Sequence, residues 1–348
     1  MVETVAFDER EEALILLDQT QLPNRTVLLR LRKQAEIREA IRRLQVRGAP
    51  AIGVTAAYGM YLAAQEFKGE DIAAFLEHFQ KAKAYLAQAR PTAVNLFWAL
   101  ERMERAMKDV SGELVENIKR RLKEEADNIR EEDIRVCRKI GEYGLSLLKP
   151  EDGILTHCNA GRLAAVRYGT ATAPLYVGQE QGYHFQIYAD ETRPLLQGAR
   201  LTAYELSEAG MDVTVLCDNM AASIMSEGKI QAVLVGCDRV AMNGDTANKI
   251  GTSMVAMAAH HYGIPFYVCA PTSTIDPALT GGKQIPIEQR DGTEVTHQWY
   301  KEPMAPEGVP AYNPAFDVTD HRLITAIITE YGVLRPPYKE AFQKILSL

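Results

Sequence analysis

A dense group of polar side chains follows one apolar run in this sequence. The stretch GCDRVAMNGDTANKIGT, residues 236–252, begins directly after the run AVLV and contains carboxylates, amides and an ammonium: Asp238, Asp245, Asn248 and Lys249. Groups of this kind could hold a metal ion, hold a nucleotide phosphate, or transfer protons on a small substrate. These three kinds of chemistry need different partners elsewhere in the chain.

Metal binding and nucleotide binding both lack their usual sequence signals. No pair of histidines at helical spacing accompanies the carboxylates, and carboxylates that follow strands commonly cap the next helix. The chain has no GxGxxG motif after a strand, and NGDTANKIGT is not a P-loop because Asn248 rather than glycine precedes Lys249. We therefore expect no metal and no bound nucleotide, and we expect Gly161 of CNAG to serve only as a backbone turn.

Proton transfer needs a group whose pKa lies near neutrality. A carboxylic acid in an apolar pocket has its charged form disfavoured, which raises its pKa toward that range. Asp238 follows VLVGC directly, and Cys158 ends the apolar segment GILTHC in a similar way. A thiol at this place could donate a proton, act as a nucleophile or only fill the core. Asp238 and Cys158 are the candidate acid–base groups.

Two arginines in the first half of the chain precede prolines of the kind that begin a helix. Arg47 stands three residues before Pro50 in RGAP, and Arg90 directly precedes Pro91 in RPT. A guanidinium beside the free amides and positive end of a helix binds phosphate well. Lys249, expected on the helix after the fourth strand, would be a third ligand. The alternative for each arginine is an ordinary surface charge near a helix start.

The first half of the chain has the pattern of a helical domain. The expected helices are QAEIREAIRRLQ, the alanine-rich stretch after the RGAP motif, DIAAFLEHFQKAKAYLAQA, NLFWALERMERAMK and the charged run from 114 to 148, in which apolar residues recur three and four apart. Alternating charges give that last run a solvated face. We expect residues 1–145 to form a mainly helical amino-terminal domain.

Beyond KPEDG, residues 149–153, short apolar segments alternate with helix-length segments. The expected strands are GILTHC, HFQIYAD, DVTVLCD, QAVLVGC and PFYVCAP, and RLAAVRYGTATAPLYVGQEQG and ANKIGTSMVAMAAHHYG are among the expected helices. This alternation indicates a parallel sheet with crossover helices. The sequence predicts an α/β protein in which residues 146–348 form a Rossmann-like, doubly wound catalytic domain, with ligands at the carboxyl ends of the strands.

Composition and charge exclude several classes of partner. The 348 residues carry a formal net charge of −7, so no basic field attracts nucleic acid. The longest uncharged stretch, residues 48–65, is interrupted by proline and glycine and is too short for a membrane span. The acidic amino terminus lacks a signal-peptide pattern, and the five cysteines contain no CxxC pair. We expect a cytoplasmic protein that binds neither nucleic acid nor membrane.

Several motifs taken together resemble those of the methylthioribose-1-phosphate isomerase family, over nearly the whole chain. They are RGAPAIGVTAAYG, ARPTAVNLFWAL, THCNAG followed by RYGTA, ETRPLLQGARLTAYEL, VGCDRVAMNGDTANKIGT and YNPAFDVT. The wider superfamily includes ribose-1,5-bisphosphate isomerase and regulatory subunits of the exchange factor of translation initiation. The resemblance implies a homodimer that converts 5-methylthioribose 1-phosphate, a sugar phosphate, to 5-methylthioribulose 1-phosphate in methionine salvage without a cofactor.

The resemblance also implies roles for single residues. Cys158 of CNAG and Asp238 of GCDR match the catalytic pair of the family. The positions that match its substrate contacts are Arg47, Gly48 and Ala49 of RGAP, Arg90 of RPT, Gln197 of LLQG, and Asn248 with Lys249 of ANK. Two other functions stay open: an isomerase of 5-deoxyribose 1-phosphate, and a non-catalytic regulatory subunit that binds a sugar phosphate or nucleotide. The regulatory subunits are not expected to keep this whole set.

Overall fold

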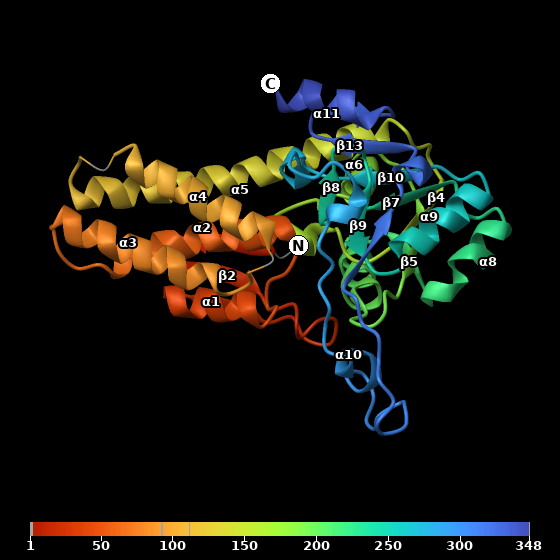
Figure 1. The fold of residues 1–348 in the computed structure, drawn as a ribbon, viewed down its shortest axis with the longest axis horizontal. Coiled ribbons are helices and arrows are strands. Elements are labelled where there is room, and N and C mark those ends of the chain that lie inside the picture. The colour runs from red at the N-terminus through yellow and green to blue at the C-terminus, as the bar shows by residue number, and fades with distance from the viewer. Residues whose placement is uncertain (1–2, 92, 111, 348) are drawn as a thin grey trace. The chain divides into compact units, whose positions relative to one another are not determined.

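The computed structural model describes residues 3–91, 93–110 and 112–347 (Figure 1). The chain divides into two compact units, one of Met1–Arg135 with Arg162–Gly169 and the other of Val136–Gly161 with Thr170–Leu348. The division falls inside helix α5 (Val115–Leu145), whereas the sequence predicts a boundary between residues 145 and 146. The short segment 162–169 is tied into the first unit, where the Val166 backbone N–H donates to Asp133 Oδ2 at 2.8 Å.

The first unit is built around one apolar helix. Helix α2 (Ala49–Glu66) is buried from Ala51 to Ala64, and α1 (Gln34–Arg42), α3 (Ile72–Ala87) and α4 (Val94–Lys108) pack against it. These helices and the first part of α5 are the red to yellow ribbons in Figure 1. A helix that is hydrophobic on all sides must be buried on all sides. The helices predicted for this region are present. The alanine-rich one, α2, lies at the centre because only a central helix is buried on all sides.

A small antiparallel sheet precedes these helices, where the sequence predicts no strand. Its strands are β1 (Val5–Asp8), β2 (Ala13–Leu17) and β3 (Leu28–Leu31), in the order β1-β2-β3. In β2, ALILL, every residue except the central Ile15 is buried, so both faces of the strand contribute buried side chains. A short, continuous apolar run of this kind lacks the alternation by which a strand is recognised.

The main sheet of the second unit has seven strands in the order β14-β13-β10-β7-β4-β5-β6. Their bounds are β4 (Gly153–Thr156), β5 (Gln186–Asp190), β6 (Asp212–Leu216), β7 (Ala232–Val235), β10 (Phe266–Cys269), β13 (Ala326–Thr329) and β14 (Gly332–Leu334). All neighbours pair in parallel except β13 with β14. Counted from β4, the six parallel strands have the Rossmann order 3-2-1-4-5-6, and the order reverses between β4 and β7.

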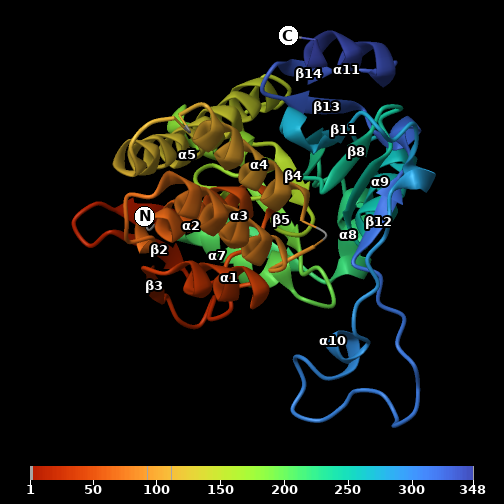
Figure 2. The same cartoon turned by 60° about the vertical axis from the view of Figure 1, so that its left-hand side comes forward.

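Helices connect the strands of this sheet. They are α6 (Ala173–Glu180), α7 (Ala203–Glu208), α8 (Ala221–Ser226) and α9 (Thr252–His261), and α11 (Tyr338–Leu346) follows the last strand at the carboxyl terminus. Figures 1 and 2 both place α8 beside α9, and the two helices are in contact. The helix predicted directly after CNAG is wrong: a 3₁₀ turn (Arg162–Ala164) occupies that place, because positive φ angles at Tyr168 and Gly169 interrupt the chain before α6 begins.

A second sheet of four strands contains a further correction. Its order is β11-β8-β9-β12, with β8 (Arg239–Ala241), β9 (Thr246–Lys249), β11 (Ile275–Asp276) and β12 (Phe316–Thr319). The segment ANK is strand β9 rather than the start of a helix, and α9 begins only at Thr252. The dipeptide Asn243-Gly244, with Gly244 at φ +94°, turns β8 into β9. An Asn-Gly pair is a strong hairpin signal, so the sequence did contain the information.

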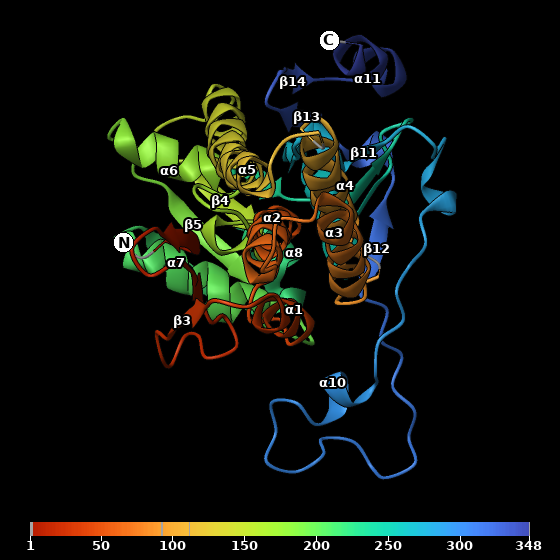
Figure 3. The ribbon, with the colours of Figure 1, turned by 90° about the vertical axis from the view of Figure 1, so that its left-hand side faces the viewer.

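A long connection between β11 and β12 extends from the second unit as an arm, residues 277–315, that carries the short helix α10 (Thr293–Thr296) (Figure 3). Two hydrogen bonds fix it to the loop after β5. Arg193 Nη2 donates to the Val295 carbonyl at 2.7 Å, and Trp299 Nε1 donates to the Pro194 carbonyl at 2.6 Å. The arm therefore borders the loop that leads to Gln197.

Candidate active site

The two candidate acid–base residues follow adjacent strands. Strands β4 and β7 pair in parallel, with Thr156 opposite Leu234, so the chain leaves both strands at the same edge of the sheet. Cys158 lies in the loop after β4 and Asp238 in the loop after β7. The loops pack tightly, since a Cβ atom on Gly236 would lie 2.3 Å from the Ala160 Cβ. This is the point at which the strand order reverses, where ligands bind in sheets of this kind.

Cys158 is buried and has an unusual backbone. It is 7% exposed and has φ of +68°, which is rare for a residue other than glycine. Its N–H donates to Thr192 Oγ1 at 2.8 Å, and its carbonyl accepts from Thr202 Oγ1 at 2.6 Å. Two threonine side chains thus hold the backbone in a conformation that costs free energy. Strain maintained in this way is typical of functional loops.

Asp238, by contrast, is exposed. The prediction that an apolar pocket within the sheet encloses this carboxylate is wrong. Its N–H donates to the Ala247 carbonyl at 2.9 Å, so Asp238 already belongs to the base of the β8–β9 hairpin, which leads the chain away from the buried strand. The preceding Cys237 packs inward instead, and burial raises the pKa of its thiol to about 12. Cys237 therefore serves the core rather than acid–base chemistry.

The β8–β9 hairpin brings two predicted substrate contacts next to Asp238. Asn248 and Lys249 directly follow Ala247, the partner of the Asp238 N–H. Asn248 is 5% exposed, and its Nδ2 donates to Thr252 Oγ1 at 3.0 Å. Lys249 is half-buried, with Nζ 4.4 Å from the centre of the Phe316 ring. Both residues lie on strand β9 rather than on a helix, directly after the residue that pairs with Asp238.

Gln197 supplies a buried acceptor at the end of the neighbouring strand β5. The residue is 5% exposed, and within the described part of the chain its Oε1 has no hydrogen-bond partner. The following Gly198 lies against the end of β5, since a Cβ atom there would be 1.7 Å from the Asp190 carbonyl oxygen. Buried polar atoms without partners are rare in proteins. A hydroxyl group of a ligand would satisfy this amide oxygen.

In the helical unit, RGAP forms the start of α2, as predicted. Gly48 is the N-cap with φ +90°, Ala49 is the first helical residue, and Pro50 occupies the first turn. A side chain at Gly48 is excluded, because a Cβ atom would lie 2.4 Å from the backbone of Ala164. Arg47 is half-buried beside this helix start. The arrangement suits an anion, with backbone amides and a guanidinium at the positive end of a helix.

Arg90 precedes the start of α4 less directly than predicted. Helix α4 begins at Val94, so Pro91 lies before the helix rather than in its first turn, and Thr92 lies outside the described residues. Arg90 is half-buried, and its carbonyl accepts from the Ala93 N–H at 3.1 Å. The first turns of α4 and α2 are neighbours, as the close approach of Gly53 to the Asn95 carbonyl shows.

In the described ranges, two groups of three side chains place potential metal-ligand atoms within 4.8 Å of one another. The first is His157, Asp190 and Asp218. Both nitrogens of His157 already face protein acceptors, and both oxygens of Asp218 accept backbone N–H groups, from Thr192 and Arg193, at 2.7 Å. Apart from Asp190 Oδ1, which has no partner among the described residues, these donors and acceptors satisfy one another, so the geometry fits a hydrogen-bonded cluster better than a metal site.

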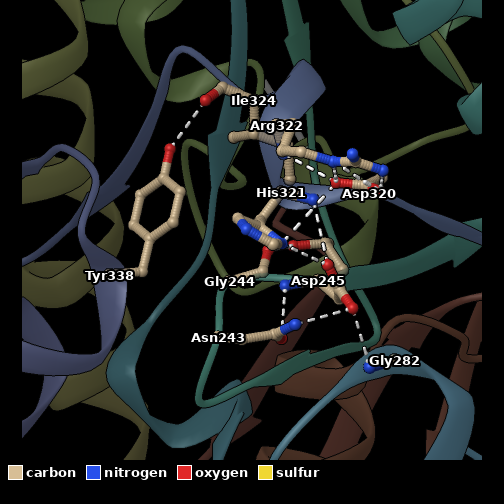
Figure 4. Close-up of polar contacts among 10 residues, drawn as sticks. Asn243, Gly244, Asp245, Gly282, Asp320, His321, Arg322, Ile324 and Tyr338 are labelled. Atoms are coloured by element: carbon tan, nitrogen blue, oxygen red, sulfur yellow. Dashed lines mark hydrogen bonds and ion pairs between the residues drawn. The ribbon is translucent and has the colours of Figure 1, made fainter.

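The second group surrounds Asp245 (Figure 4). Asp245 Oδ1 accepts from the backbone N–H of His321 at 3.0 Å and lies 2.7 Å from its Nδ1, while Oδ2 accepts from Asn243 Nδ2 and from the Gly282 N–H. Asp320 pairs with Arg322, which lowers the pKa of Asp320 to about 2. Asp245 therefore joins the hairpin turn to the arm and to the loop after β12. Its role in the polar stretch 236–252 is structural.

The residues that support Cys158 could not be recognised from the sequence. The threonines at positions 192 and 202 and the pair of His157 with Asp190 lie around its loop, and none belongs to a recognisable catalytic spacing. Their role depends on contacts between loops after different strands, which no local pattern reports. The only signal was their position, since His157 and Asp190 both stand at strand ends.

Comparisons with known proteins identify the family of this chain. The sequence profile of the Initiation factor 2 subunit family matches residues 45–336. The chain is 62% identical over 344 residues to a methylthioribose-1-phosphate isomerase of Symbiobacterium thermophilum, which covers 99% of this chain and 96% of the relative. It is 55% identical over 343 residues to a 5-deoxyribose 1-phosphate isomerase of Petrotoga mobilis, covering 99% of each.

The fold has a counterpart among solved structures. The crystal structure of 5-methylthioribose 1-phosphate isomerase from Pyrococcus horikoshii OT3 matches with a TM-score of 0.94 and 44% identity, over 100% of this chain and 96% of that chain. The match confirms the predicted α/β class. It also agrees with a helical amino-terminal region and a sheet-rich carboxyl-terminal one. The chain belongs to the Initiation factor 2 subunit family, and it is similar over nearly its whole length to relatives named as isomerases of pentose 1-phosphates.

Proposed function

We propose that this chain is an aldose–ketose isomerase that converts 5-methylthioribose 1-phosphate to 5-methylthioribulose 1-phosphate, a step of methionine salvage. The observation that carries the proposal is the placement of Cys158 and Asp238 in touching loops at the reversal point of the sheet, in a chain 62% identical to a relative of that name. The reaction moves hydrogen from C2 to C1 within one molecule. It therefore requires no external oxidant or reductant.

The phosphate on C1 sets the chemical problem, because it locks the sugar in its ring form. Asp238 donates a proton to the ring oxygen as the bond from C1 to that oxygen breaks. Hydrogen then passes from C2 to C1, either as a proton through an enolate or as a hydride, and the C2 hydroxyl gives its proton to the Asp238 carboxylate, which restores the acid. Cys158 acts at the C1–C2 centre, as an acid–base group or by stabilising the developing charge.

The remaining candidate residues bind and orient the substrate. The unpaired amide oxygen of Gln197 and the side chain of Asn248 suit hydroxyl groups of the sugar. The cationic side chains, with the amides of Gly48 and Ala49 at the start of α2, suit the phosphate: Arg47, Arg90 and Lys249. Contacts far from the reacting carbons accelerate the reaction by holding them in place.

Substitution of the exposed acid tests the proposal. Asp238→Asn should retain affinity for the substrate while turnover falls by ~10²–10⁴, the usual contribution of a general acid or base. Asp212→Asn is a matched control, because Asp212 is also exposed but stands at the opposite, amino-terminal end of strand β6. Assays with a chelator present test independence from metal. Full turnover by Asp238→Asn would remove this residue from the mechanism.

Isotope exchange separates the two routes for hydrogen transfer. Turnover in deuterated water should place solvent deuterium at C1 if an enolate forms, because the proton removed from C2 exchanges before it returns. Complete retention of the original hydrogen would support hydride transfer or a proton shielded from water. Mass spectrometry of the product distinguishes these outcomes.

A second substrate is also proposed, 5-deoxyribose 1-phosphate. A relative with this name is 55% identical to the chain over 99% of its length. The two sugars differ only in the substituent on C5, so the same acid–base groups serve both. Measuring kcat/KM for both sugars side by side identifies the better substrate. A chain that binds these sugars but converts neither would instead be a regulatory subunit.

We further propose a cytoplasmic homodimer. Apolar side chains are exposed on strand β6, on the 3₁₀ turn before α8 and on helix α9, namely Val215, Met220, Met254 and Met257, and a second copy of the chain would cover them. All five cysteines are free, which suits a reducing compartment. Light scattering of the purified protein tests the dimer. Among the described residues, no helix has the length and hydropathy needed to cross a bilayer.

A further inference from the structure

One buried histidine joins three loops of the proposed site. His157 precedes Cys158 in the chain, and its side chain is 0% exposed. Its Nδ1 lies 3.0 Å from Asp190 Oδ2, at the end of β5, and its Nε2 lies 2.9 Å from the carbonyl of Ile250, the residue after Lys249. The imidazole thus links the Cys158 loop to the end of β5 and to the strand that carries Asn248 and Lys249.

The partners of the ring fix where its protons lie. A carbonyl oxygen only accepts hydrogen bonds, so Nε2 of His157 carries hydrogen and donates to Ile250. Nδ1 faces a carboxyl group, so a second proton lies between them, on His157 or on Asp190. Burial raises the pKa of Asp190. Burial lowers the pKa of His157, but the hydrogen bond and charge of Asp190 raise it by more. The pair therefore retains this proton.

The ring has no room to move away. Gly251, at φ +101°, lies against it, and a Cβ atom there would be 2.9 Å from His157 Cε1. The Gly251 N–H donates to Asp317 Oδ2 at 2.8 Å, which holds this glycine in place. Among the described residues, the carboxylates of Asp218 and Asp317 also act electrostatically on the ring. Because the ring cannot shift, its hydrogen bonds fix the positions of the loops that it joins.

We propose that His157, oriented by Asp190, is a positioning residue of this enzyme: its hydrogen bond to Ile250 holds Asn248 and Lys249 in register with Cys158. The inference rests on the proposed isomerase function. Neither His157 nor Asp190 needs to touch the substrate. Loss of the bond to Ile250 should therefore weaken substrate binding through Lys249 more than it slows the chemical step.

Two amide substitutions separate the two hydrogen bonds of the ring. The side-chain nitrogen of asparagine reaches the place of Nδ1, and that of glutamine reaches the place of Nε2. His157→Asn should keep the contact with Asp190 but lose the hydrogen bond to the Ile250 carbonyl. Its KM should rise by roughly tenfold, about the effect of one hydrogen bond. His157→Gln should keep Ile250, and its KM should stay within about threefold of the wild type.

The control is a histidine elsewhere that also meets a carbonyl. His78 Nε2 lies 2.8 Å from the Ala63 carbonyl in the helical unit, and His78→Gln should leave KM and kcat unchanged. If His157→Asn does not fold, Asp190→Asn and Asp190→Ser replace it. Asparagine at 190 can still orient the ring by donating to Nδ1, whereas serine is too short, so only the serine variant should show a raised KM.

The outcomes are distinct. A KM that rises in His157→Asn and is restored in His157→Gln supports positioning. Folded variants that share the wild-type KM, or whose KM rises equally, overturn it, because the bond to Ile250 would then not matter. A wild-type protein without turnover on either pentose 1-phosphate would instead reject the proposed function, whatever the variants show.

Discussion

Two aspartate–histidine pairs of the second unit have the same chemistry and opposite surroundings. Asp190 and His157 are 3.0 Å apart with both side chains 0% exposed, and Asp245 and His321 are 2.7 Å apart with side chains 18% and 35% exposed. Burial raises the pKa of Asp190. For Asp245 burial acts in the same direction, but hydrogen bonds from Asn243, His321 and Gly282 lower the pKa by more.

The difference shows that the number of hydrogen bonds donated to an aspartate, rather than the presence of a histidine, decides whether it is ionised. Asp245 accepts from two backbone N–H groups and an amide, which stabilise its ionised form. Asp190 has the ring of His157 at Oδ2, and among the residues described its Oδ1 has no partner. Asp245 and His321 therefore form an ordinary structural contact around an ionised carboxylate. His157 and Asp190 keep one proton between them in the folded state.

The largest effect should come from removing the buried carboxylate. Asp190→Ala should lower the free energy of unfolding by about 3–5 kcal/mol, because His157 is then left as an uncompensated buried group. Urea denaturation of the purified protein measures this loss. A loss below about 1 kcal/mol would show that the pair is not coupled in the folded state.

Removing the half-buried carboxylate, Asp245, should have a smaller effect. Asp245→Ala leaves the N–H groups of Gly282 and His321 without an acceptor, but water can reach a side chain that is 18% exposed. We expect a loss of about 1–3 kcal/mol in the same denaturation experiment. If this loss equalled that of Asp190→Ala, burial would not be what distinguishes the two pairs.

The two pairs should respond to opposite changes in pH. The raised pKa of His157 means that the folded pair keeps a proton which the unfolded chain releases above about pH 6.5, so stability should fall as pH rises, by at most about 1.4 kcal/mol per unit. The lowered pKa of Asp245 means that its contribution is present above about pH 3.9 and is lost as pH falls below that value.

Denaturation at several pH values tests these signs. His157→Gln cannot titrate, so it should lose the alkaline decline of the wild type while keeping the decline in acid. Asp245→Asn should lose the decline in acid and keep the decline at alkaline pH. An alkaline decline of unchanged slope in His157→Gln would mean that another group causes it.

The smallest effect should come from the exposed histidine. His321→Gln removes the side-chain contact with Asp245 but keeps the backbone N–H bond to the same oxygen. For a half-exposed pair the loss should be about 0.5–1 kcal/mol. A thermal melt compared with the wild type measures it, and a loss as large as that of Asp245→Ala would show that the imidazole, not the backbone, holds this contact together.

Much of the fold could be predicted because the signals are local. Helix α5 carries sustained three- and four-residue periodicity, α2 is a long apolar run, and the strands of the main sheet are short apolar runs bounded by turns. The alternation of strand and helix also predicted that Cys158 and Asp238 stand at strand ends. The β8–β9 hairpin was missed because its strands are short, and the helical pattern that continues into α9 obscured the Asn-Gly turn.

The sequence by itself determined the α/β class, the helix starts at RGAP and the strand ends that supply the candidate residues. Only the tertiary structure decided that Asp238 is exposed while Cys158 is buried, and that His157 meets partners 33 and 93 positions away in the chain. The physical reason is that periodicity reports which face of an element is apolar, whereas burial and protonation at a loop depend on the groups that other loops bring against it.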